Sequence, residues 1–328
     1  MSLDPSVAAV RNAVRRVLAD GTPTVLVACS GGADSLALLE ATVFEGHKLG
    51  RRVVGVTVDH GLQDGSAEQA GRVVEQMAGL GADETVAVRV RVEGGGQGPE
   101  AAAREARYAV LGELSQRWGD ADVLLGHTLD DQAETVLLGL TRGSGARSLS
   151  GMRRGFEVYR RPLLDVTRGQ TEAACRAQGL SFWSDPHNDD PRFTRSRVRH
   201  RVLPLLEEEL GPGVAGTLAR TADQLREDST ALDELAAAAR DEACADGQVD
   251  CAALARHPLA VRLRALRLAA LAAGSPASEL FRTHVVALAD LVPGPPGPVR
   301  GKQVQLPGHV TAYREGNLLK FRRTAVSG

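Results

Sequence analysis

Lysine and cysteine are both scarce in this 328-residue sequence. Three of the 39 basic residues are lysines, so arginine carries nearly all of the positive charge and a single arginine is weak evidence for a site. The four cysteines form no CxxC pair and no cluster with histidine at zinc spacing (Cys29, Cys175, Cys244, Cys251). These absences argue against a disulfide framework and against a structural zinc site.

Long apolar runs are absent as well. No stretch reaches the roughly 18 uninterrupted apolar residues of a membrane helix, and the N-terminus lacks the basic start, apolar run and small-residue cleavage site of a signal peptide. We therefore expect a cytoplasmic protein with no membrane partner. The composition, 43% apolar and 24% charged, is typical of a globular chain. The length predicts one large domain with one or two smaller ones.

The first half of the sequence alternates short β-branched runs with longer amphipathic segments. Strands are predicted at residues 24–29, 52–59, 85–92 and 122–126, and helices at 34–49, 66–79, 100–118 and 129–141. Strands separated by helices of this length form parallel βαβ units. The sequence therefore predicts a doubly wound α/β domain, with a parallel sheet covered by helices on both faces.

From about residue 204 the pattern changes to long helices rich in alanine, leucine and arginine. Helices are predicted at residues 214–245, 258–273 and 279–291, and two alternating stretches near the C-terminus predict a small hairpin or sheet. We expect this part of the chain to form a smaller, mainly helical domain.

The sharpest motif, Ser30-Gly31-Gly32-Ala33-Asp34-Ser35, follows the first predicted strand. It is neither the GxxxxGK[ST] loop nor the GxGxxG fingerprint, and the first of these is absent from the chain. Two glycines let the backbone turn tightly, and the start of the next helix offers unpaired N–H groups and a favourable dipole to a phosphate. The alternative is an ordinary strand-to-helix turn in which the serine and aspartate are caps.

Acidic and histidine side chains follow the second and fourth predicted strands. Asp59 and His60 end the second strand and fit either a capped turn or a contact to adenosine. After the fourth strand, His127 precedes a helix on which Glu134 lies four residues after Asp130 and three after Asp131, so Glu134 can share a face with either aspartate. Carboxylates beside a triphosphate suit Mg²⁺, although an acidic first turn also stabilises the helix dipole. Because ligands bind beyond the carboxyl ends of parallel strands, we expect these residues to lie at one site.

A basic segment occupies residues 142–201, which contain 13 arginines against six acidic residues in a chain of net charge −2. Such a segment suits a phosphate backbone, and Phe193 together with arginine side chains suits stacking on an extruded base. The alternative is a solvated, arginine-rich helix start.

Several motifs together resemble one family. SGGADS resembles the pyrophosphate-binding loop of the N-type ATP pyrophosphatases. Within that superfamily, VDHGL at 58–62, AREARY at 103–108, HTLDDQAET at 127–135 and RGSG at 142–145 resemble elements of the tRNA(Ile)-lysidine synthases. Residues 185–199 resemble a further element, except that His187 and Ser196 replace its usual serine and asparagine. The resemblance is most specific over residues 25–205 and implies a member without the second C-terminal domain of longer relatives.

The resemblance implies roles for individual residues. The expected catalytic residues are Asp34, Asp131, Glu134, His127 and Arg107, of which Asp34 and Asp131 also bind Mg²⁺. The expected ATP-binding residues are Ser30, Gly31, Gly32, Ala33, Asp34, Ser35, Asp59 and His60. The expected RNA-binding residues are Arg104, Asn188, Phe193, Arg195, Arg197 and Arg199.

The same resemblance implies a fold, a reaction and partners. The fold is an adenine nucleotide alpha hydrolase-like domain at 1–210, followed by a helical connector at 211–248 and a small tRNA-binding domain at 249–328. The reaction consumes ATP, adenylates the wobble cytidine of a CAU-anticodon tRNA(Ile), and joins free L-lysine to C2 of that base. AMP and pyrophosphate are released. The sequence leaves the oligomeric state open, with a homodimer as one candidate.

Two other functions fit parts of the sequence. A tRNA thiolase uses the same ATP-splitting domain, but it needs reactive or cluster-binding cysteines, and the chain has no CxxC. A regulatory module that binds ATP and RNA without turnover would not need the acidic residues that follow His127.

Overall fold

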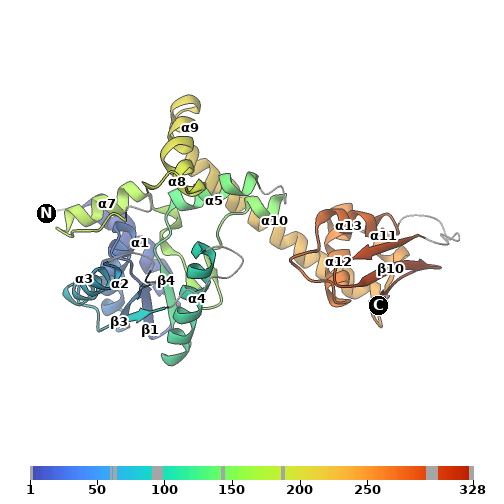
Figure 1. Ribbon diagram of the computed structural model, residues 1–328, viewed down its shortest axis with the longest axis horizontal. Helices are drawn as coiled ribbons and strands as arrows, with labels where there is room; N and C mark the ends of the chain where they lie inside the picture. Colours follow the sequence, from blue (N-terminus) through green and yellow to red (C-terminus); the bar gives the residue numbers. More distant parts are fainter. Residues whose placement is uncertain are drawn as a thin grey trace. The chain divides into compact units, whose positions relative to one another are not determined.

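The computed structural model describes residues 3–59, 61, 65–90, 99–141, 145–185, 189–292 and 302–324. The chain divides into two compact units (Figure 1). The first comprises Met1–Gly143 and Ser148–Ala222, and the second comprises Ser144–Arg147 and Asp223–Gly328. In the described ranges, no helix is both long enough and apolar enough to cross a membrane.

A six-stranded sheet in the order β3-β2-β1-β4-β6-β5 forms the centre of the first unit. Its main strands are parallel: β1 (Thr24–Ala28), β2 (Arg52–Asp59), β3 (Glu84–Arg89) and β4 (Asp122–Leu125). The hairpin of β5 (Gly155–Phe156) and β6 (Tyr159–Arg160) extends the sheet beside β4. The predicted α/β sheet is confirmed, and β3 ends short of the predicted residue 92.

Helices cover both faces of this sheet. They are α1 (Pro5–Leu18), α2 (Ala33–Lys48), α3 (Ser66–Gly79), α4 (Pro99–Arg117), α5 (Leu129–Leu140) and α7 (Arg168–Ala177). The four helices predicted from the sequence in this region are present to within one residue at each end. Helix α1 was not predicted, although its signal is local: Asp4 accepts hydrogen bonds from the N–H groups of Ser6 and Val7, and Pro5 begins the helix.

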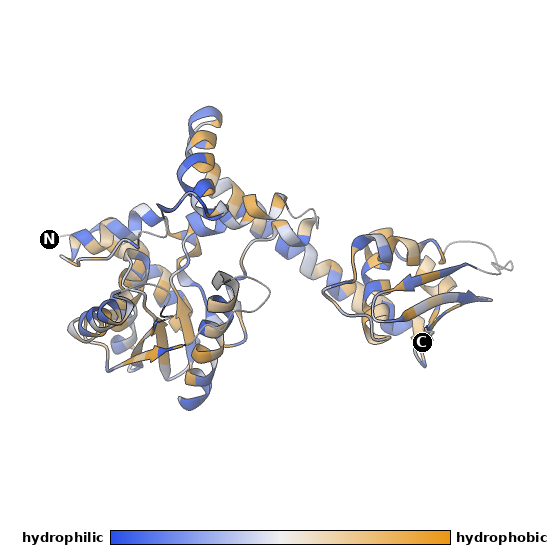
Figure 2. Ribbon diagram, viewed as in Figure 1, coloured by the Kyte–Doolittle hydropathy of each residue, from blue (hydrophilic) through white to orange (hydrophobic). Residues whose placement is uncertain are grey.

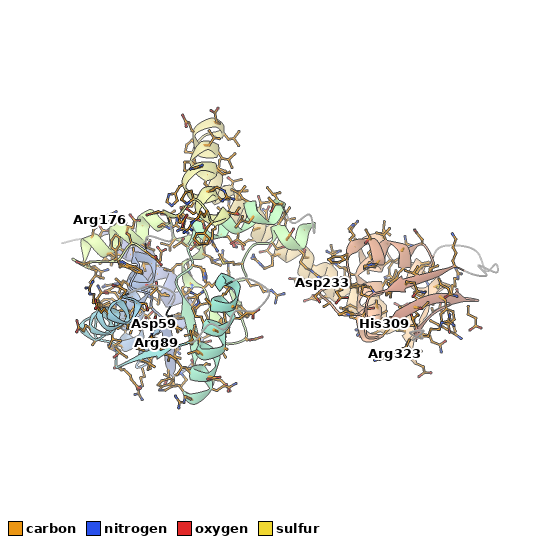
Figure 3. All side chains as sticks on the ribbon, viewed as in Figure 1. Asp59, Arg89, Arg176, Asp233, His309 and Arg323 are labelled. Carbon is orange, nitrogen blue, oxygen red and sulfur yellow. The ribbon has the colours of Figure 1, made fainter. Side chains whose placement is uncertain are left out.

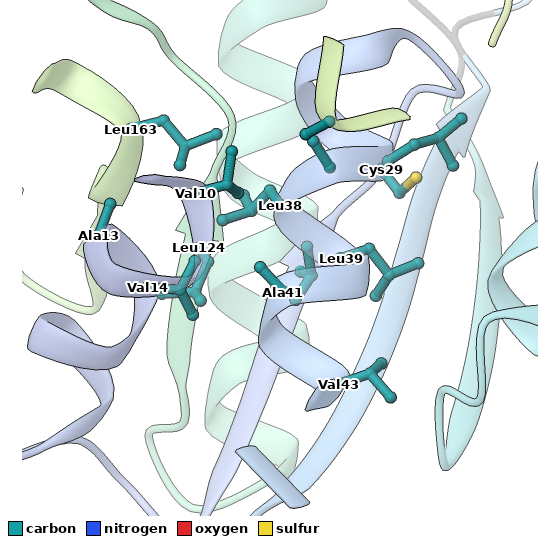
Figure 4. Packing of buried hydrophobic residues seen from close by; sticks show 14 of the residues in the cluster. Val10, Ala13, Val14, Cys29, Leu38, Leu39, Ala41, Val43, Leu124 and Leu163 are labelled. Carbon is teal, nitrogen blue, oxygen red and sulfur yellow. The ribbon is translucent and has the colours of Figure 1, made fainter. Parts of the chain in front are cut away.

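Alternate residues of each central strand pack into different cores. Val25 and Val27 of β1 belong to a cluster that contains residues of α1, α2, α3 and α7 (Figure 4). Leu26, between them, packs on the other face with Leu111 of α4. Successive side chains of a strand point to opposite faces, so both faces of β1 are buried, and Figure 2 shows these strands as mainly hydrophobic. A sheet covered in this way exposes the ends of its strands, where a ligand can bind.

A run of short helical segments closes the first unit. After a 3-10 turn (Pro162–Asp165) and α7 come α8 (Thr194–Arg197), one π-helical turn (Val198–Val202) and α9 (Leu203–Leu210). Val198 and Leu203 pack with Ala133 of α5 in a small separate cluster. This packing places the arginines of α8 and of the π-helical turn beside the first turns of α5.

The second unit combines helices with a sheet. Its five-stranded antiparallel sheet has the order β7-β8-β11-β10-β9. The strands are β7 (Cys244–Ala245), β8 (Gln248–Asp250), β9 (Gln303–Leu306), β10 (Val310–Glu315) and β11 (Leu318–Arg323). The helices that this unit contains or shares are α6 (Ala146–Leu149), α10 (Val214–Ala243), α11 (Cys251–Ala255), α12 (Leu259–Ala272) and α13 (Arg282–Ala289). The small sheet that was one of the two predictions for the C-terminus is present, and it is extended by β7 and β8 from the stretch that follows α10.

Candidate active site

A cleft opens where the strand order of the first unit reverses. From β1 the chain continues to β2 and β3 on one side, whereas β4 lies on the other side of β1. The cleft has a volume of about 1240 Å³ and is lined by residues that follow β1, β2 and β4, together with residues of α7 and α8. Ligands of doubly wound sheets bind at such reversal points. Of the residues expected here, Asp59, His127 and Asp131 line the cleft, whereas Glu134 is fully buried outside its lining and His60 lies outside the described residues.

The nucleotide loop, residues 30–35, joins β1 to α2 at the floor of the cleft. Gly31 has φ +83°, and a Cβ atom at this position would lie 2.7 Å from Val73 Cγ2. The Ser35 hydroxyl donates to the Gly32 carbonyl at 2.9 Å and accepts from the Ser30 N–H at 3.2 Å, which closes the turn. Gly32 is the N-cap of α2 and supplies no side-chain cap. The first N–H groups of α2 are therefore available to an anion.

Asp34, in the first turn of α2, points its carboxylate toward α5 and α7. It accepts a hydrogen bond from the Thr171 hydroxyl, and its Oδ2 lies 3.9 Å from Arg168 Nε. Burial, with a further contribution from the nearby charge of Asp131, raises the pKa of Asp34 to about 6, against the opposing effect of the Thr171 hydrogen bond. A cation in the cleft would stabilise the charged form of this side chain.

An arginine–carboxylate cluster forms the wall of the cleft beside α5. It consists of Asp131, Glu134, Arg168, Arg195 and Arg199. The Glu134 carboxylate is fully buried and accepts from Arg195 Nε at 2.7 Å, from Arg199 Nε at 2.7 Å and from Arg168 Nη2 at 3.3 Å. Asp131 Oδ1 lies 3.2 Å from Arg168 Nη2, 3.2 Å from Arg199 Nη2 and 3.4 Å from Arg195 Nη2. Three arginines thus surround two carboxylates.

Local structure fixes the Asp131 carboxylate in this cluster. Thr128 caps α5, and its N–H donates to Asp131 Oδ2 at 2.9 Å in a capping box. Burial alone would favour the neutral acid, but the charges of Arg195 and Arg168 outweigh it and hold the pKa of Asp131 below its usual range. Asp131 is therefore an anion whose charge is already matched by protein cations.

His127, between β4 and α5, lies on a different part of the cleft wall. Burial, aided by the positive charges of Arg161, Arg107 and Arg104, lowers the pKa of His127 to about 3, against the opposing charge of Asp131. Arg107 also lines the cleft, and its buried Nε has no hydrogen-bond partner in the described part of the chain. Arg104 is exposed and stands over the Tyr108 ring, with its Cζ 5.1 Å from the ring centroid.

Comparison with known proteins decides between the families that share this fold. The family model of the PP-loop domain matches residues 6–206. The chain is 50% identical to the tRNA(Ile)-lysidine synthase of Streptomyces coelicolor, over 98% of this chain and all of that one. It is 55% identical to the tRNA(Ile)-lysidine synthase of Thermobifida fusca, over 88% and 90% of the two chains. The chain belongs to the tRNA(Ile)-lysidine synthases.

A solved structure supports the fold of this lysidine synthase family member. The U34-tRNA thiolase NcsA from Methanococcus maripaludis, with its [4Fe-4S] cluster, is similar with a TM-score of 0.57. The similarity covers 68% of this chain and 78% of that one at 19% identity. At this identity the likeness concerns the fold alone, so the thiolase alternative rests on a distant structural neighbour.

Of the remaining residues predicted for this lysidine synthase, two line the cleft, one points away from it and two are not described. Asp59, at the end of β2, lines the cleft and accepts a hydrogen bond from the Gly61 N–H at 2.8 Å. Its Oδ2 lies 3.6 Å from Nε of Arg89 at the end of β3. Figure 3 labels both residues. Phe193 lines the cleft at the N-cap of α8. Arg197 points away from the lining and donates to the carbonyls of residues 191 and 192 at 2.8 and 2.9 Å. His60 and Asn188 lie outside the described residues.

Sequence reasoning missed three residues that line the lysidine synthase cleft or bond to the side chains that line it. Arg168 and Thr171 come from α7, and the capping box of Thr167 with Gln170 was a local signal for the start of that helix. Arg161 precedes the 3-10 turn and carried no signal that distinguishes it from other arginines. The basic segment was interpreted as a positive surface, yet Arg161, Arg168, Arg195 and Arg199 all bind groups inside the cleft wall.

Proposed function

We propose that this tRNA(Ile)-lysidine synthase uses ATP to activate the wobble cytidine of a CAU-anticodon tRNA(Ile), and then joins L-lysine to C2 of that base. One observation carries the proposal. The nucleotide loop, His127 and four members of the arginine–carboxylate cluster, all but the buried Glu134, line a single cleft at the reversal point of the sheet. The chemistry is C–N bond formation driven by the cleavage of ATP to AMP and pyrophosphate.

In the first step, the C2 carbonyl oxygen of the cytidine bonds to the α-phosphorus of ATP. The bond between that phosphorus and the bridging oxygen of the β-phosphate breaks, and pyrophosphate leaves. The nucleotide loop supports this step because unpaired N–H groups at the start of α2 stabilise negative charge on a departing phosphate. Its backbone is fixed by the Ser35 hydrogen bonds before any ligand binds.

In the second step, the ε-amine of lysine bonds to C2 and the bond from C2 to the AMP oxygen breaks. The cationic side chains around His127 suit the negative charge that the departing AMP carries. Arg107 has a buried nitrogen without a partner in the described residues, which is the kind of donor that such a charge would use.

Mg²⁺ is a further part of the proposal. A nucleotide-bound Mg²⁺ commonly takes one or two protein carboxylates and completes its shell with phosphate oxygens and water. The facing carboxylates of Asp34 and Asp131 fit this pattern, and no set of three acidic, histidine or cysteine ligands occurs within the described ranges. When bound, the ion would supply positive charge to the phosphate oxygens.

The target base has to leave the anticodon loop stack to enter the cleft, which is easier from a single strand than from a duplex. Phe193 lines the cleft and offers a ring for stacking. The exposed Arg104, the half-exposed Arg195 and Arg199, and Arg197 beside them suit the tRNA backbone. We assign catalysis to residues 1–210, a connector to 211–248 and further tRNA contacts to 249–328, with a homodimer as one candidate assembly.

The cysteines disfavour a thiolase. Cys29, Cys175 and Cys251 are buried, and burial raises the pKa of the Cys29 and Cys251 thiols and that of Cys175 to about 12. A thiol that stays protonated at neutral pH is a poor nucleophile and a poor metal ligand. Cys29 and Cys175 lie in the first unit, and Cys244 and Cys251 lie in the second.

The function is tested by incorporation of labelled lysine into tRNA transcripts that carry a CAU anticodon. We expect labelling of the isoleucine transcript and none of the methionine transcript, with AMP and pyrophosphate formed. Asp34→Ala should abolish both products, while Asp83→Ala, a surface aspartate paired with His47, should not. ATP turnover without labelling would retain the ATP chemistry and overturn lysine as the acceptor.

A further inference from the structure

Arg161 is a buried cation without an acidic partner in the described residues. Its side chain is 5% exposed. Nη1 donates to the Arg153 carbonyl at 2.7 Å, Nη2 to the Tyr108 hydroxyl at 3.1 Å, and Nε to His127 Nδ1 at 3.3 Å. The guanidinium also stands over the Phe156 ring, 4.9 Å from its centroid. Burying a charge without a counter-charge costs free energy of folding. We therefore expect Arg161 to have a function that offsets this cost.

The contact to His127 fixes which nitrogen of that ring carries the proton. An arginine side chain has five N–H donors and no acceptor, so the ring nitrogen that faces it must accept. His127 Nδ1 is therefore unprotonated. A neutral imidazole keeps one proton, which then sits on Nε2.

The surroundings of His127 keep the ring neutral. Burial and the charges of Arg161, Arg107 and Arg104 act against its protonation, and the charge of Asp131 acts in the other direction. His127 lines the cleft, and no hydrogen-bond partner of its Nε2 occurs in the described part of the chain. The ring thus presents an N–H group, rather than a lone pair, to whatever enters this part of the cleft.

We propose that Arg161 is a positioning residue that holds His127 as the neutral Nε2–H tautomer, so that His127 donates a hydrogen bond to an anionic oxygen of a bound substrate. This inference rests on the proposed function for its substrates. The oxygen belongs either to the α-phosphate of ATP and of the adenylated base or to the carboxylate of lysine. In this role His127 is a donor that stabilises charge and not a base that removes a proton.

Tyr108 and Phe156 make the positioning rigid. The Tyr108 and Tyr159 rings meet edge to face at 4.9 Å, and the Phe156 and Tyr159 rings stack at 4.9 Å. The Tyr159 hydroxyl donates to the Tyr108 carbonyl at 2.6 Å. Arg161 lies against these rings with each of its donor groups directed at a fixed acceptor, which limits the rotation of His127 as well.

The tautomer is measured directly in the full chain by ¹⁵N-histidine labelling and long-range ¹H–¹⁵N correlation at pH 7. The chain has eight histidines, and His127→Gln identifies the signals of His127 by their loss. We expect an unprotonated Nδ1 and a protonated Nε2. A protonated Nδ1, or a ring protonated on both nitrogens, would overturn the proposal without any need for a variant at Arg161.

Arg161→Met then tests whether Arg161 determines the tautomer of His127. It should convert the His127 signals to a mixture of tautomers and lower the rate of lysidine formation about 100-fold, as expected for a misdirected hydrogen-bonding group. The matched control is Arg153→Met, whose side chain is exposed and makes no hydrogen bond or ion pair within the described ranges. The signals of the other seven histidines report whether the variant folds. If Arg161→Met folds and leaves tautomer and rate unchanged, Arg161 is only a structural residue.

Substitutions of His127 separate a donor from a base. A glutamine amide reaches the position of Nε2 and can donate there, whereas an asparagine amide reaches the position of Nδ1. We expect His127→Gln to retain measurable activity and His127→Asn to lose it, while equal loss in both would contradict the donor role. A raised KM for ATP assigns the oxygen to phosphate, and a raised KM for lysine assigns it to carboxylate. An inactive wild-type chain would refute the proposed function and leave the tautomer measurement standing.

Discussion

The nucleotide loop and the arginine–carboxylate cluster face the same cleft but are built in different ways. The loop is made of six consecutive residues, and hydrogen bonds of the Ser35 hydroxyl to Ser30 and Gly32 close its turn from within the loop. The cluster joins residues from α5, α7, α8 and the π-helical turn, up to 68 positions apart. The loop presents N–H donors through its backbone conformation. The cluster uses side-chain charge to hold together α5, α7 and the continuous segment of α8 and the π-helical turn.

A charged residue in an active site can therefore have a structural role. Glu134 is fully buried beneath three guanidinium groups, so it anchors Arg168, Arg195 and Arg199 more directly than it contacts the cleft. The two regions should therefore respond differently to substitution. Changes in the cluster should lower stability and activity together, and changes in the loop should act mainly on the binding of ATP.

The largest effect is expected for Glu134→Gln. The substitution keeps the shape of the side chain but leaves three buried or half-buried arginines with one carboxylate. Removing one partner of a buried ion pair costs about 3–5 kcal/mol, so the free energy of unfolding should fall by that amount. Urea unfolding followed by tryptophan fluorescence measures it, because Trp118 and Trp183, the two tryptophans of the chain, both lie in the first unit.

The matched control for this prediction is Glu84→Gln. Glu84 pairs with Arg52 at 2.5 Å, but both side chains are substantially exposed, and exposed pairs contribute about 0–1 kcal/mol. If both substitutions cost the same, Glu134 is not the anchor of the cluster.

A smaller effect on stability is expected for Gly31→Ala in the loop. The residue would have to adopt φ +83° and place its Cβ 2.7 Å from Val73 Cγ2. The left-handed conformation costs roughly 1–2 kcal/mol, and the close contact displaces the loop, so ATP/pyrophosphate exchange should fall more than stability does. Gly50→Ala is the control, because Gly50 has φ +66° and no atom within 4 Å of the added Cβ.

A second substitution makes the loop prediction stricter. Val73→Ala removes the methyl group that the new Cβ would meet, so the double variant should recover part of the exchange activity that Gly31→Ala loses. No recovery would mean that the backbone conformation alone explains the effect.

The two regions also differ in how far the sequence predicted them. The loop could be located because SGGADS is contiguous and follows a predicted strand, and the residues after β4 were placed at the same edge by the logic of parallel sheets. The cluster could not, because nothing in the order of residues tells that Arg195 and Arg199 turn inward to Glu134 while Arg197 between them does not. That choice depends on how α8 and the π-helical turn pack against α5. The same limit applied to Arg161, whose partners come from three separate segments.

Arg195 and Arg197 offer a sharper comparison, since both were predicted to bind RNA. Arg195 Nε and Nη2 are used on Glu134 and Asp131, whereas Arg197 donates to loop carbonyls. We expect Arg195→Met to lower the free energy of unfolding by about 1–3 kcal/mol and to weaken tRNA binding. Arg197→Met should weaken tRNA binding alone. In each case the slope of log K against log salt should fall by about 0.7 for a lost single-strand phosphate contact, and an unchanged slope would remove that residue from the RNA surface.

The smallest effect is expected for a single ion pair outside both regions. Arg15 Nε and Nη2 donate to the two oxygens of Glu45 at 2.8 Å, and these hydrogen bonds, despite the opposing effect of burial, hold the pKa of Glu45 below its usual value. A lowered carboxyl pKa contributes stability above the unfolded-state value of about 4.3, and that stability is lost as the pH falls through the folded-state value. Arg15→Met should therefore cost up to about 1 kcal/mol at pH 7, and urea unfolding near pH 3 should show a smaller difference from wild type. A difference that does not shrink would mean that the Arg15 stem, and not its charge, stabilises α1 against α2.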